Sequence, residues 1–177
     1  MGRECGQKKE TNMEKRQLLE LIKKGTYTWN TWRQQHPSEE ADLHEEDLSQ
    51  CDLRGANLSR ANLSGATMSG ANLSQADLSW SNLIGADLRK ADVSEVNLMN
   101  ADLSGANTME AKFTRANFTN AVLIDTNFID ADLSEANFAG ADLTGAYLKE
   151  ANLRGAIITQ TQLDKARSPE ELPPPQQ

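Results

Sequence analysis

Apolar and polar residues repeat with a period of five along most of this chain. From Ala41 to Lys165 the sequence divides into 25 consecutive five-residue units without an insertion or a deletion. The third position is Leu in 17 of the 25 units, and all four Phe of the protein also fall there. The first position is Ala in 19 units, and the second is Asp or Asn in 19. This period matches neither an α-helix, with 3.6 residues per turn, nor a long β-strand, with a repeat of two.

The order of residues within one unit predicts a short extended segment followed by a turn. Positions one and three are two residues apart, so both side chains point inward while position two points outward. Positions four and five then turn the chain. The eight Gly of this region, from Gly55 to Gly155, all occupy position five, where a positive φ costs Gly least. A five-residue unit cannot bury its own Leu, so successive units are expected to wind and stack into a solenoid.

The tandem units, as in GANLSRANLSGATMSGANLSQADLSW, resemble the pentapeptide-repeat family over about 125 of the 177 residues. The resemblance implies an all-β solenoid, a right-handed quadrilateral β-helix with four units per coil. The 25 units would then form about six coils, roughly 30 Å long at ~4.8 Å per strand spacing. Stacking of residues twenty apart predicts contact between Phe118 and Phe138. Thr108, the single polar residue at position three, is expected to donate its hydroxyl to a carbonyl of a neighbouring coil.

The ends of the chain depart from the period, and the sequence predicts four segments in all. They are a disordered N-terminus at 1–10, a helical N-terminal cap at 11–37, the β-helix at 38–166 and a disordered Pro-rich tail at 167–177.

Two helices are expected in the N-terminal cap. The first covers residues 11–24, with a capping box formed by Thr11 and Glu14. The second runs from Trp29 to about Gln35 and ends before a proline. The segment WNTWR within it is similar to leaders that precede the repeats in some family members. The residues expected to cover the first coil are Leu18, Leu21, Ile22, Trp29 and Trp32.

Branched apolar residues interrupt the polar outer positions in the stretch AVLIDTNFID, residues 121–130. When residues twenty apart are stacked, these residues join others in one patch over the middle coils. We interpret this patch as a binding site for a partner protein, formed by Ile84, Met109, Val122, Ile124 and Ile129. Neighbouring carboxylates complete a polar rim, formed by Glu110, Asp125, Asp130 and Glu150. The alternative is that these are scattered exposed apolar residues, which are common on protein surfaces.

Composition and motifs narrow the possible functions. The net charge of −8 argues against direct nucleic-acid binding through phosphate contacts. The polar start and the lack of a long apolar run favour a cytoplasmic protein without a membrane segment. The two Cys and two His have no metal-ligand spacing, so neither a metal nor another cofactor is expected. Most serines occupy turn positions and no catalytic motif is present, so the protein is not expected to be an enzyme.

Three functions remain open. The first is a non-catalytic interaction scaffold or regulator, a monomer or a homodimer, that binds an unidentified protein partner through the β-helix faces. The resemblance implies this role, because the family consists largely of binding or regulatory proteins and is abundant in bacteria, especially cyanobacteria. The second is an acidic DNA mimic that binds DNA gyrase, a type II topoisomerase, as the quinolone-resistance members do. The repeat region has 18 acidic and 9 basic residues, which permits mimicry. The third is a structural module that self-associates.

Overall fold

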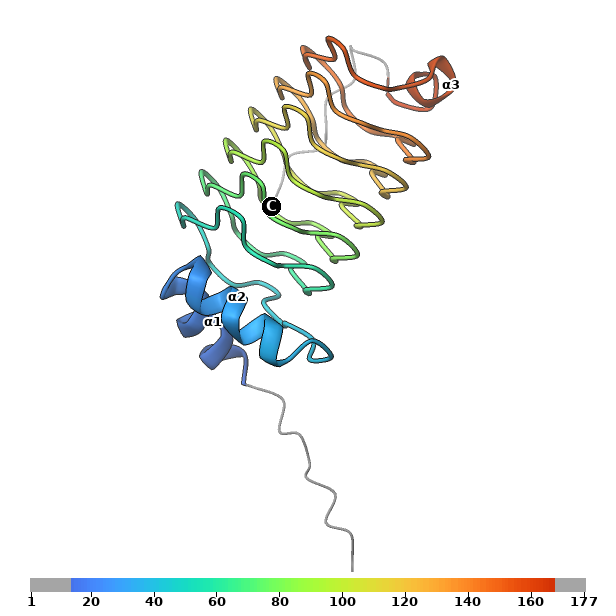
Figure 1. The fold of residues 1–177 in the computed structure, drawn as a ribbon. Coiled ribbons are helices and arrows are strands. Elements are labelled where there is room, and N and C mark those ends of the chain that lie inside the picture. The colour runs from blue at the N-terminus through green and yellow to red at the C-terminus, as the bar shows by residue number, and fades with distance from the viewer. Residues whose placement is uncertain (1–13, 168–177) are drawn as a thin grey trace, which may run out of the picture.

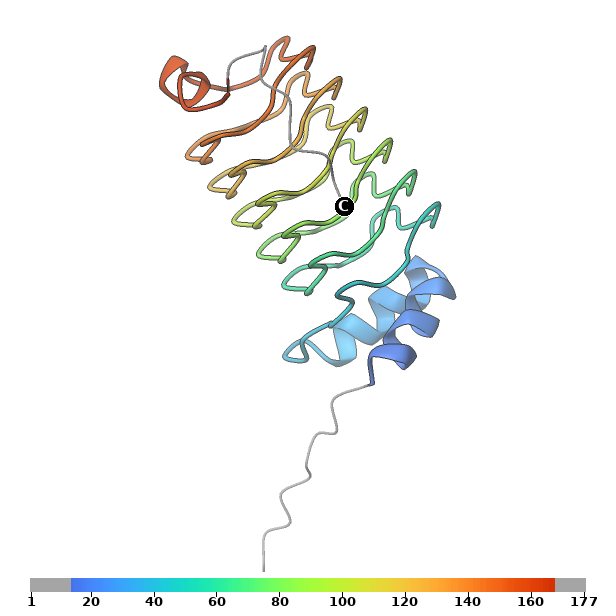
Figure 2. The same ribbon diagram turned by 180° about the vertical axis from the view of Figure 1, so that it is seen from behind.

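A rod of stacked coils joins two helices at one end to a short helix at the other (Figures 1 and 2). The computed structural model describes residues 14–167. Within them the helices are α1 (Lys15–Lys23), α2 (Thr26–Gln35) and α3 (Gln160–Leu163). The predicted disordered start, and the predicted tail beyond its first residue, lie outside the described residues. None of the described helices is long and apolar enough to cross a membrane.

Parallel backbone pairing with a period of twenty residues builds the rod. Each position-two residue pairs with the position-two residue twenty places later, and the amide of Asn62, for example, donates to the carbonyl of Ala41 at 3.0 Å. A period of twenty means that four five-residue units complete one coil and that the rod has four faces. The pairs run from Asp42 with Asn62 to Asn137 with Ile157.

We number the faces by their first units. Face 1 contains unit 41–45 and every unit twenty residues later, and faces 2, 3 and 4 begin with units 46–50, 51–55 and 56–60. The faces follow one another around each coil in chain order, so face 2 shares corners with faces 1 and 3 and lies opposite face 4.

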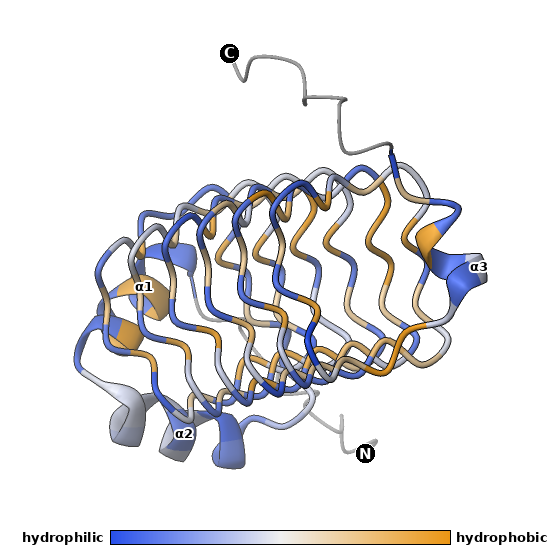
Figure 3. Cartoon of the chain, turned by 90° about the horizontal axis from the view of Figure 1, so that it is seen from above, coloured by the Kyte–Doolittle hydropathy of each residue, from blue (hydrophilic) through white to orange (hydrophobic). Residues whose placement is uncertain are grey.

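Inward side chains at positions one and three fill the inside of the rod, as the pattern predicts. Nearly all the Ala and Leu at these positions are buried in one continuous core, and apolar and polar segments alternate around each coil in Figure 3. The rings of Phe118 and Phe138 stack with centroids 4.9 Å apart, which confirms their predicted contact. The hydroxyl of Thr108 donates to the carbonyl of Asn127 at 2.6 Å, which confirms its predicted partner in the next coil.

Each turn is built by two positions that the pattern singled out. From residue 45 to residue 155 every position-five residue has a positive φ, between 54° and 73°, whether or not it is Gly. The Asp or Asn of position two accepts a bond from the amide two residues later. In one example Asp102 Oδ1 accepts from the amide of Ser104 at 2.9 Å and from its hydroxyl at 2.6 Å. The acids and amides of position two are therefore structural parts of the turns.

The two N-terminal helices differ from the predicted ones at their starts. The N-cap of α1 is Glu14, whose capping box is completed by Gln17, so the prediction of a box between Thr11 and Glu14 is wrong about its partner. Thr11 itself lies outside the described residues. Helix α2 begins at Thr26, three residues before the predicted Trp29, because Gly25 adopts a φ of 111° and turns the chain directly after α1.

Side chains of α2 bind backbone groups of the first coil, on face 4 and at its corner with face 3. Further along the rod the corresponding face 4 groups pair with the preceding coil, as the amide of Asp77 does with the carbonyl of Ala56 at 2.9 Å, whereas the carbonyl at position five, here that of Gly55, has no such backbone partner among the described coils. The first coil has no preceding coil, and side chains replace it. Trp29 Nε1 donates to Asn57 O at 2.8 Å, Asn30 Nδ2 to Gly55 O at 2.9 Å and Arg33 Nη2 to Ser59 O at 2.8 Å, while Asn30 Oδ1 accepts from the Asn57 amide at 2.8 Å.

The apolar residues predicted for this end are buried against the coil or packed on it. Leu18 and Ile22 of α1 are each 1% exposed, and Leu21 is partly buried against the same core. Trp29 is fully buried and Trp32 is 6% exposed, with ring centroids 5.2 Å apart. All five therefore lie on the side of the helices that meets the rod.

Candidate protein-interaction surface

The predicted apolar patch spans the corner between faces 1 and 2. Ile84, Val122 and Ile124 leave the chain from outward positions of face 1, whereas Met109 and Ile129 belong to face 2. Ile84 is 45% exposed, and Val122, Ile124 and Met109 are half-buried. Four of the five predicted residues therefore reach the surface. We call Ile84, Val122 and Ile124 the face 1 patch.

Ile129 is buried, and the prediction that it lies on the surface is wrong. Its side chain is only 8% exposed, although it occupies outward position four and does not belong to the apolar core. Three outward position-two residues of the same face are buried as well: Asn107 is 7% exposed, Asn127 3% and Tyr147 5%. All other residues at positions two and four of the described coils are at least partly exposed. We call these four residues the face 2 column.

The predicted rim carboxylates do not act alone. Glu110 lies 3.7 Å from the ammonium group of Lys90, one coil earlier at the same corner. Asp125 forms an ion pair of 2.9 Å with Arg167. Asp130 and Glu150 occupy the exposed position five of face 2, in the same column as Glu110. Opposite charges thus compensate part of this rim within the protein itself.

Arg167 crosses the corner between faces 1 and 2 and was not singled out by the sequence. Its amide donates to the carbonyl of Ala146 at 2.9 Å, and its Nε donates to the carbonyl of Gly145 at 3.1 Å. Its guanidinium lies 4.9 Å from the ring centre of Tyr147 and pairs with Asp125. Arg167 follows the last unit, so the period carries no signal for it. The sequence does mark Tyr147 as unusual, because an aromatic residue there replaces the usual Asp or Asn of position two.

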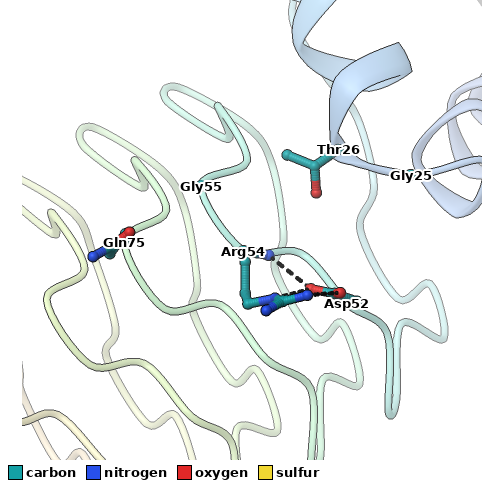
Figure 4. Close-up of a pocket in the computed structure, with 6 residues that line it drawn as sticks. All are labelled: Gly25, Thr26, Asp52, Arg54, Gly55 and Gln75. Carbon is teal, nitrogen blue, oxygen red and sulfur yellow. Dashed lines mark hydrogen bonds and ion pairs between the residues drawn. The ribbon is translucent and has the colours of Figure 1, made fainter.

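An open pocket lies beside the start of α2. This open pocket of about 530 Å³ is lined by Gly25, Thr26, Asp52, Arg54, Gly55 and Gln75 (Figure 4). Arg54 turns toward Asp52 and forms two bonds with its carboxylate, at 2.8 and 2.7 Å. These bonds from Arg54 hold the pKa of Asp52 below its ordinary value. The two charges of the pocket therefore neutralise each other, which leaves little to attract a charged ligand.

The residues with the most reactive side chains make local contacts. His44 Nδ1 lies 2.7 Å from Asp42 Oδ1, and His36 Nδ1 lies 2.9 Å from the carbonyl of Trp32. Cys51 is half-buried, and its burial raises the pKa of the thiol. Among residues 14–167 no three His, Cys, Asp or Glu side chains are placed to hold a metal ion.

Several solved structures are similar to this chain. HetL of the cyanobacterium Nostoc, a pentapeptide repeat protein involved in the regulation of heterocyst differentiation, is 27% identical, covers 75% of this chain and 84% of its own, and has a TM-score of 0.35. Rfr23 of the cyanobacterium Cyanothece 51142 is 25% identical over 76% of this chain and 96% of its own, with a TM-score of 0.45. Trypsin-treated QnrB1, a plasmid-mediated fluoroquinolone resistance protein, is 19% identical over 73% and 79%, with a TM-score of 0.32.

The sequence also matches a protein-family model over nearly all of its coils. The family model of pentapeptide repeats matches in eight copies, over residues 41–79, 76–107, 109–138 and 131–167. A separate comparison with curated proteins finds no significant match. The family-model matches cover well over half of the chain and coincide with the units that form the four faces, so the protein belongs to the pentapeptide-repeat family.

Proposed function

We propose that this protein is a non-catalytic scaffold or regulator that binds a partner protein through the faces of its β-helix. The observation that carries the proposal is the face 1 patch, where branched apolar side chains replace the polar residues usual at outward positions. Ile84 is 45% exposed, and Ile124 lies two coils further along the same column. Asp125 stands at the adjacent corner. An apolar area with a polar rim is the usual anatomy of a protein-binding surface.

The architecture supports a binding role over a catalytic one. Side chains of Leu, Phe and Ala fill the inside of the coils, so a reacting site would have to lie on the outer faces or at the ends. On the outer faces the carboxylates and amides of position two are engaged in turn bonds, as Asp102 is with Ser104. The four faces share one backbone geometry and therefore differ mainly in their outward side chains. Such a difference suits recognition of the surface of another macromolecule.

We further propose that the β-helix is right-handed and has about six coils, and that residues 11–37 serve as its N-terminal cap. The bonds from α2 to the first coil support the capping role, because an uncovered coil end would present unpaired backbone groups and an apolar cross-section. In this arrangement the helices prevent end-to-end association at the N-terminal end.

The test is affinity capture from a bacterial lysate with three forms of the protein. The first is the wild type, and the second carries Ile84→Asp and Ile124→Asp in the face 1 patch. The matched control carries Met99→Asp and Ala139→Asp, which occupy the same position-four column two coils apart on face 4 and are both exposed. Thermal unfolding of all three first establishes that each form is folded.

Each outcome separates the proposed function from its alternatives. A partner retained by the wild type and the control but lost by the face 1 variant supports the proposal. A partner bound equally by all three forms overturns the assignment of the patch, and if that partner is gyrase it favours the acidic DNA mimic. Capture of nothing, together with dimers or larger species in light scattering, favours the self-associating module.

A further inference from the structure

Over five consecutive coils face 1 has acidic residues but no basic ones. Its units between residues 61 and 145 contain no Lys, Arg or His. Faces 2 and 3 both have basic residues on the same coils, such as Lys90 and Lys112. Two acids of face 1, Asp102 and Asp142, occupy outward position two on either side of Val122 in one column. The face 1 patch therefore lies in a region of negative charge.

The two carboxylates of this column keep one oxygen each for an outside partner. Asp102 accepts the amide and the hydroxyl of Ser104 on Oδ1 alone, and Asp142 accepts the same two groups of Thr144 on its own Oδ1. Within the described part of the chain neither carboxylate forms an ion pair, although Lys165 attracts Asp142 at longer range. The negative charge beside the patch is therefore largely uncompensated.

The two edges of face 1 differ in their side chains. Trp80 occupies the corner with face 4, in the same coil as Ile84, and is 59% exposed. Exposed Trp is one of the residue types that contribute most to protein binding. At the corner with face 2, Gly65, Gly85 and Gly105 follow one another on three consecutive coils, and open space surrounds the Cα of the last two. Face 1 is thus bare along one edge, which leaves room for a bulky segment to lie along the rod.

The spacing of the apolar residues matches that of an α-helix. Ile84 and Ile124 stand two coils apart in the position-four column, which is about 10 Å at the ~4.8 Å spacing of hydrogen-bonded strands. Side chains seven residues apart on an α-helix point in nearly the same direction, and about 10.5 Å separates them along the helix axis. A helix that lies parallel to the rod can therefore place one apolar side chain on each isoleucine.

The carboxylates continue the same spacing. Asp102 lies one coil beyond Ile84, and Asp142 lies one coil beyond Ile124, which is about 5 Å in each case. On a helix the residues three or four places further along are about 4.5–6 Å away and lie on the same side. A basic residue at either of these places would meet the carboxylate while the apolar residue packs on the isoleucine.

We propose that the partner of the face 1 patch binds through a basic amphipathic α-helix, which lies along the rod on face 1. Apolar side chains seven residues apart pack on Ile84 and Ile124, the second of them also on Val122. Lys or Arg three or four residues beyond each apolar residue pairs with Asp102 and Asp142. An acidic helix would be repelled by the same carboxylates. This inference rests on the proposed function, because it names the chemistry of the partner for the same surface.

Titration of the full-length, isotope-labelled protein with designed peptides, followed by amide chemical shifts, tests the inference. The probe is a helical peptide of alanine and glutamine with isoleucine at positions 5 and 12 and lysine at positions 8, 9, 15 and 16. Its control has glutamate at the four lysine positions. We expect the lysine peptide to shift the amides of Ile84 and Ile124 and to leave those of Met99 and Ala139, at the same position on face 4, unchanged. The glutamate peptide should bind at least fivefold more weakly.

Two double variants separate the local carboxylates from the net charge of the protein. Asp102→Asn with Asp142→Asn should weaken binding of the lysine peptide at least threefold. The matched control is Asp92→Asn with Asp132→Asn, which removes the same charge from position two of face 3, also two coils apart, and should leave the affinity within twofold. Asn fills position two in many other units, so both variants keep the acceptor of the turn bonds.

Three results would overturn the inference. They are equal binding of the lysine and glutamate peptides, no shift on face 1 with the lysine peptide, and equal losses of affinity in the two double variants. Capture from the lysate reports separately on the proposed function. If a captured protein requires the face 1 patch but the lysine peptide does not shift face 1, the proposed function stands and the basic helix is wrong. If neither binds at the patch, both are wrong.

Discussion

The side-chain oxygen of Asn30 replaces a backbone carbonyl of a coil that does not exist, and its removal should loosen the first coil selectively. Its Oδ1 accepts from the amide of Asn57 at 2.8 Å and its Nδ2 donates to the carbonyl of Gly55 at 2.9 Å. Asn30→Ala removes both bonds. Each hydrogen bond contributes about 0.5–1.5 kcal/mol, so the loss of both should lower the free energy of unfolding by about 1–3 kcal/mol.

The assay is amide hydrogen exchange combined with denaturant unfolding. In Asn30→Ala the amide of Asn57 should exchange at least tenfold faster, whereas the amide of Asn97, two coils along the same column and bonded to Ala76, should be unchanged. Thr31→Ala is the control, because the Thr31 hydroxyl donates at 2.9 Å only within α2, to Tyr27, and its loss should cost less than about 0.5 kcal/mol. If exchange at Asn57 and overall stability match the control, the side chains of α2 do not replace backbone bonds and the capping argument fails.

Three further predictions concern the rod. Replacing Phe118 and Phe138 with Leu, singly and together, should give a coupling energy of about 0.5–1.5 kcal/mol in denaturant unfolding, because the two rings stack with centroids 4.9 Å apart. If the two losses of unfolding free energy are additive, there is no specific interaction between the rings. Bonds from the hydroxyl and amide of Thr144 lower the pKa of Asp142 in the folded protein. The ionised carboxylate therefore stabilises the fold above the unfolded pKa of about 3.9, and this contribution is lost as pH falls through the lower folded pKa. The melting temperature of Asp142→Asn should therefore fall less than that of the wild type between pH 5 and pH 2. An equal fall would show that Asp142 does not contribute to the acid sensitivity of the fold. Gly105→Ala should lower stability by about 1–2 kcal/mol, because Gly105 has a φ of 65° with free space around its Cα; an unchanged melting temperature would show that the turn relaxes.

The inward and outward positions were predictable because a five-residue period leaves one geometric solution for Ala and Leu. The same pattern located the Phe118–Phe138 stack and the acceptor of Thr108 once four units per coil were taken from the family resemblance. The burial of Ile129 was not predictable in this way. The pattern tells from which side of the backbone a side chain leaves, but it does not tell how deeply an outward side chain is then buried. Arg167 lies beyond the last unit, where the period no longer applies.

The start of α2 was missed for a local reason. The first turn of this helix, Thr26–Tyr27–Thr28, has β-branched and aromatic residues with weak helix propensity and no acidic residue. Packing of Trp29 on the first coil outweighs that propensity and extends the helix toward Gly25. Sequence patterns underestimate a helix whose stability comes from tertiary contact.

The twenty-residue register also governs how this protein can change length. A deletion or duplication of twenty residues would shorten or lengthen the rod by one coil and return every later side chain to the face that it held before. A deletion of five residues would keep every inward Leu inward but move all later units back by one face. Placed between units 81–85 and 121–125, it would carry Ile124 from face 1 to face 4, away from Ile84. Two deletions that keep every Leu inward can therefore differ in their effect on recognition. Between the units that form the face 1 patch, only a change by a multiple of four units keeps its residues on one face.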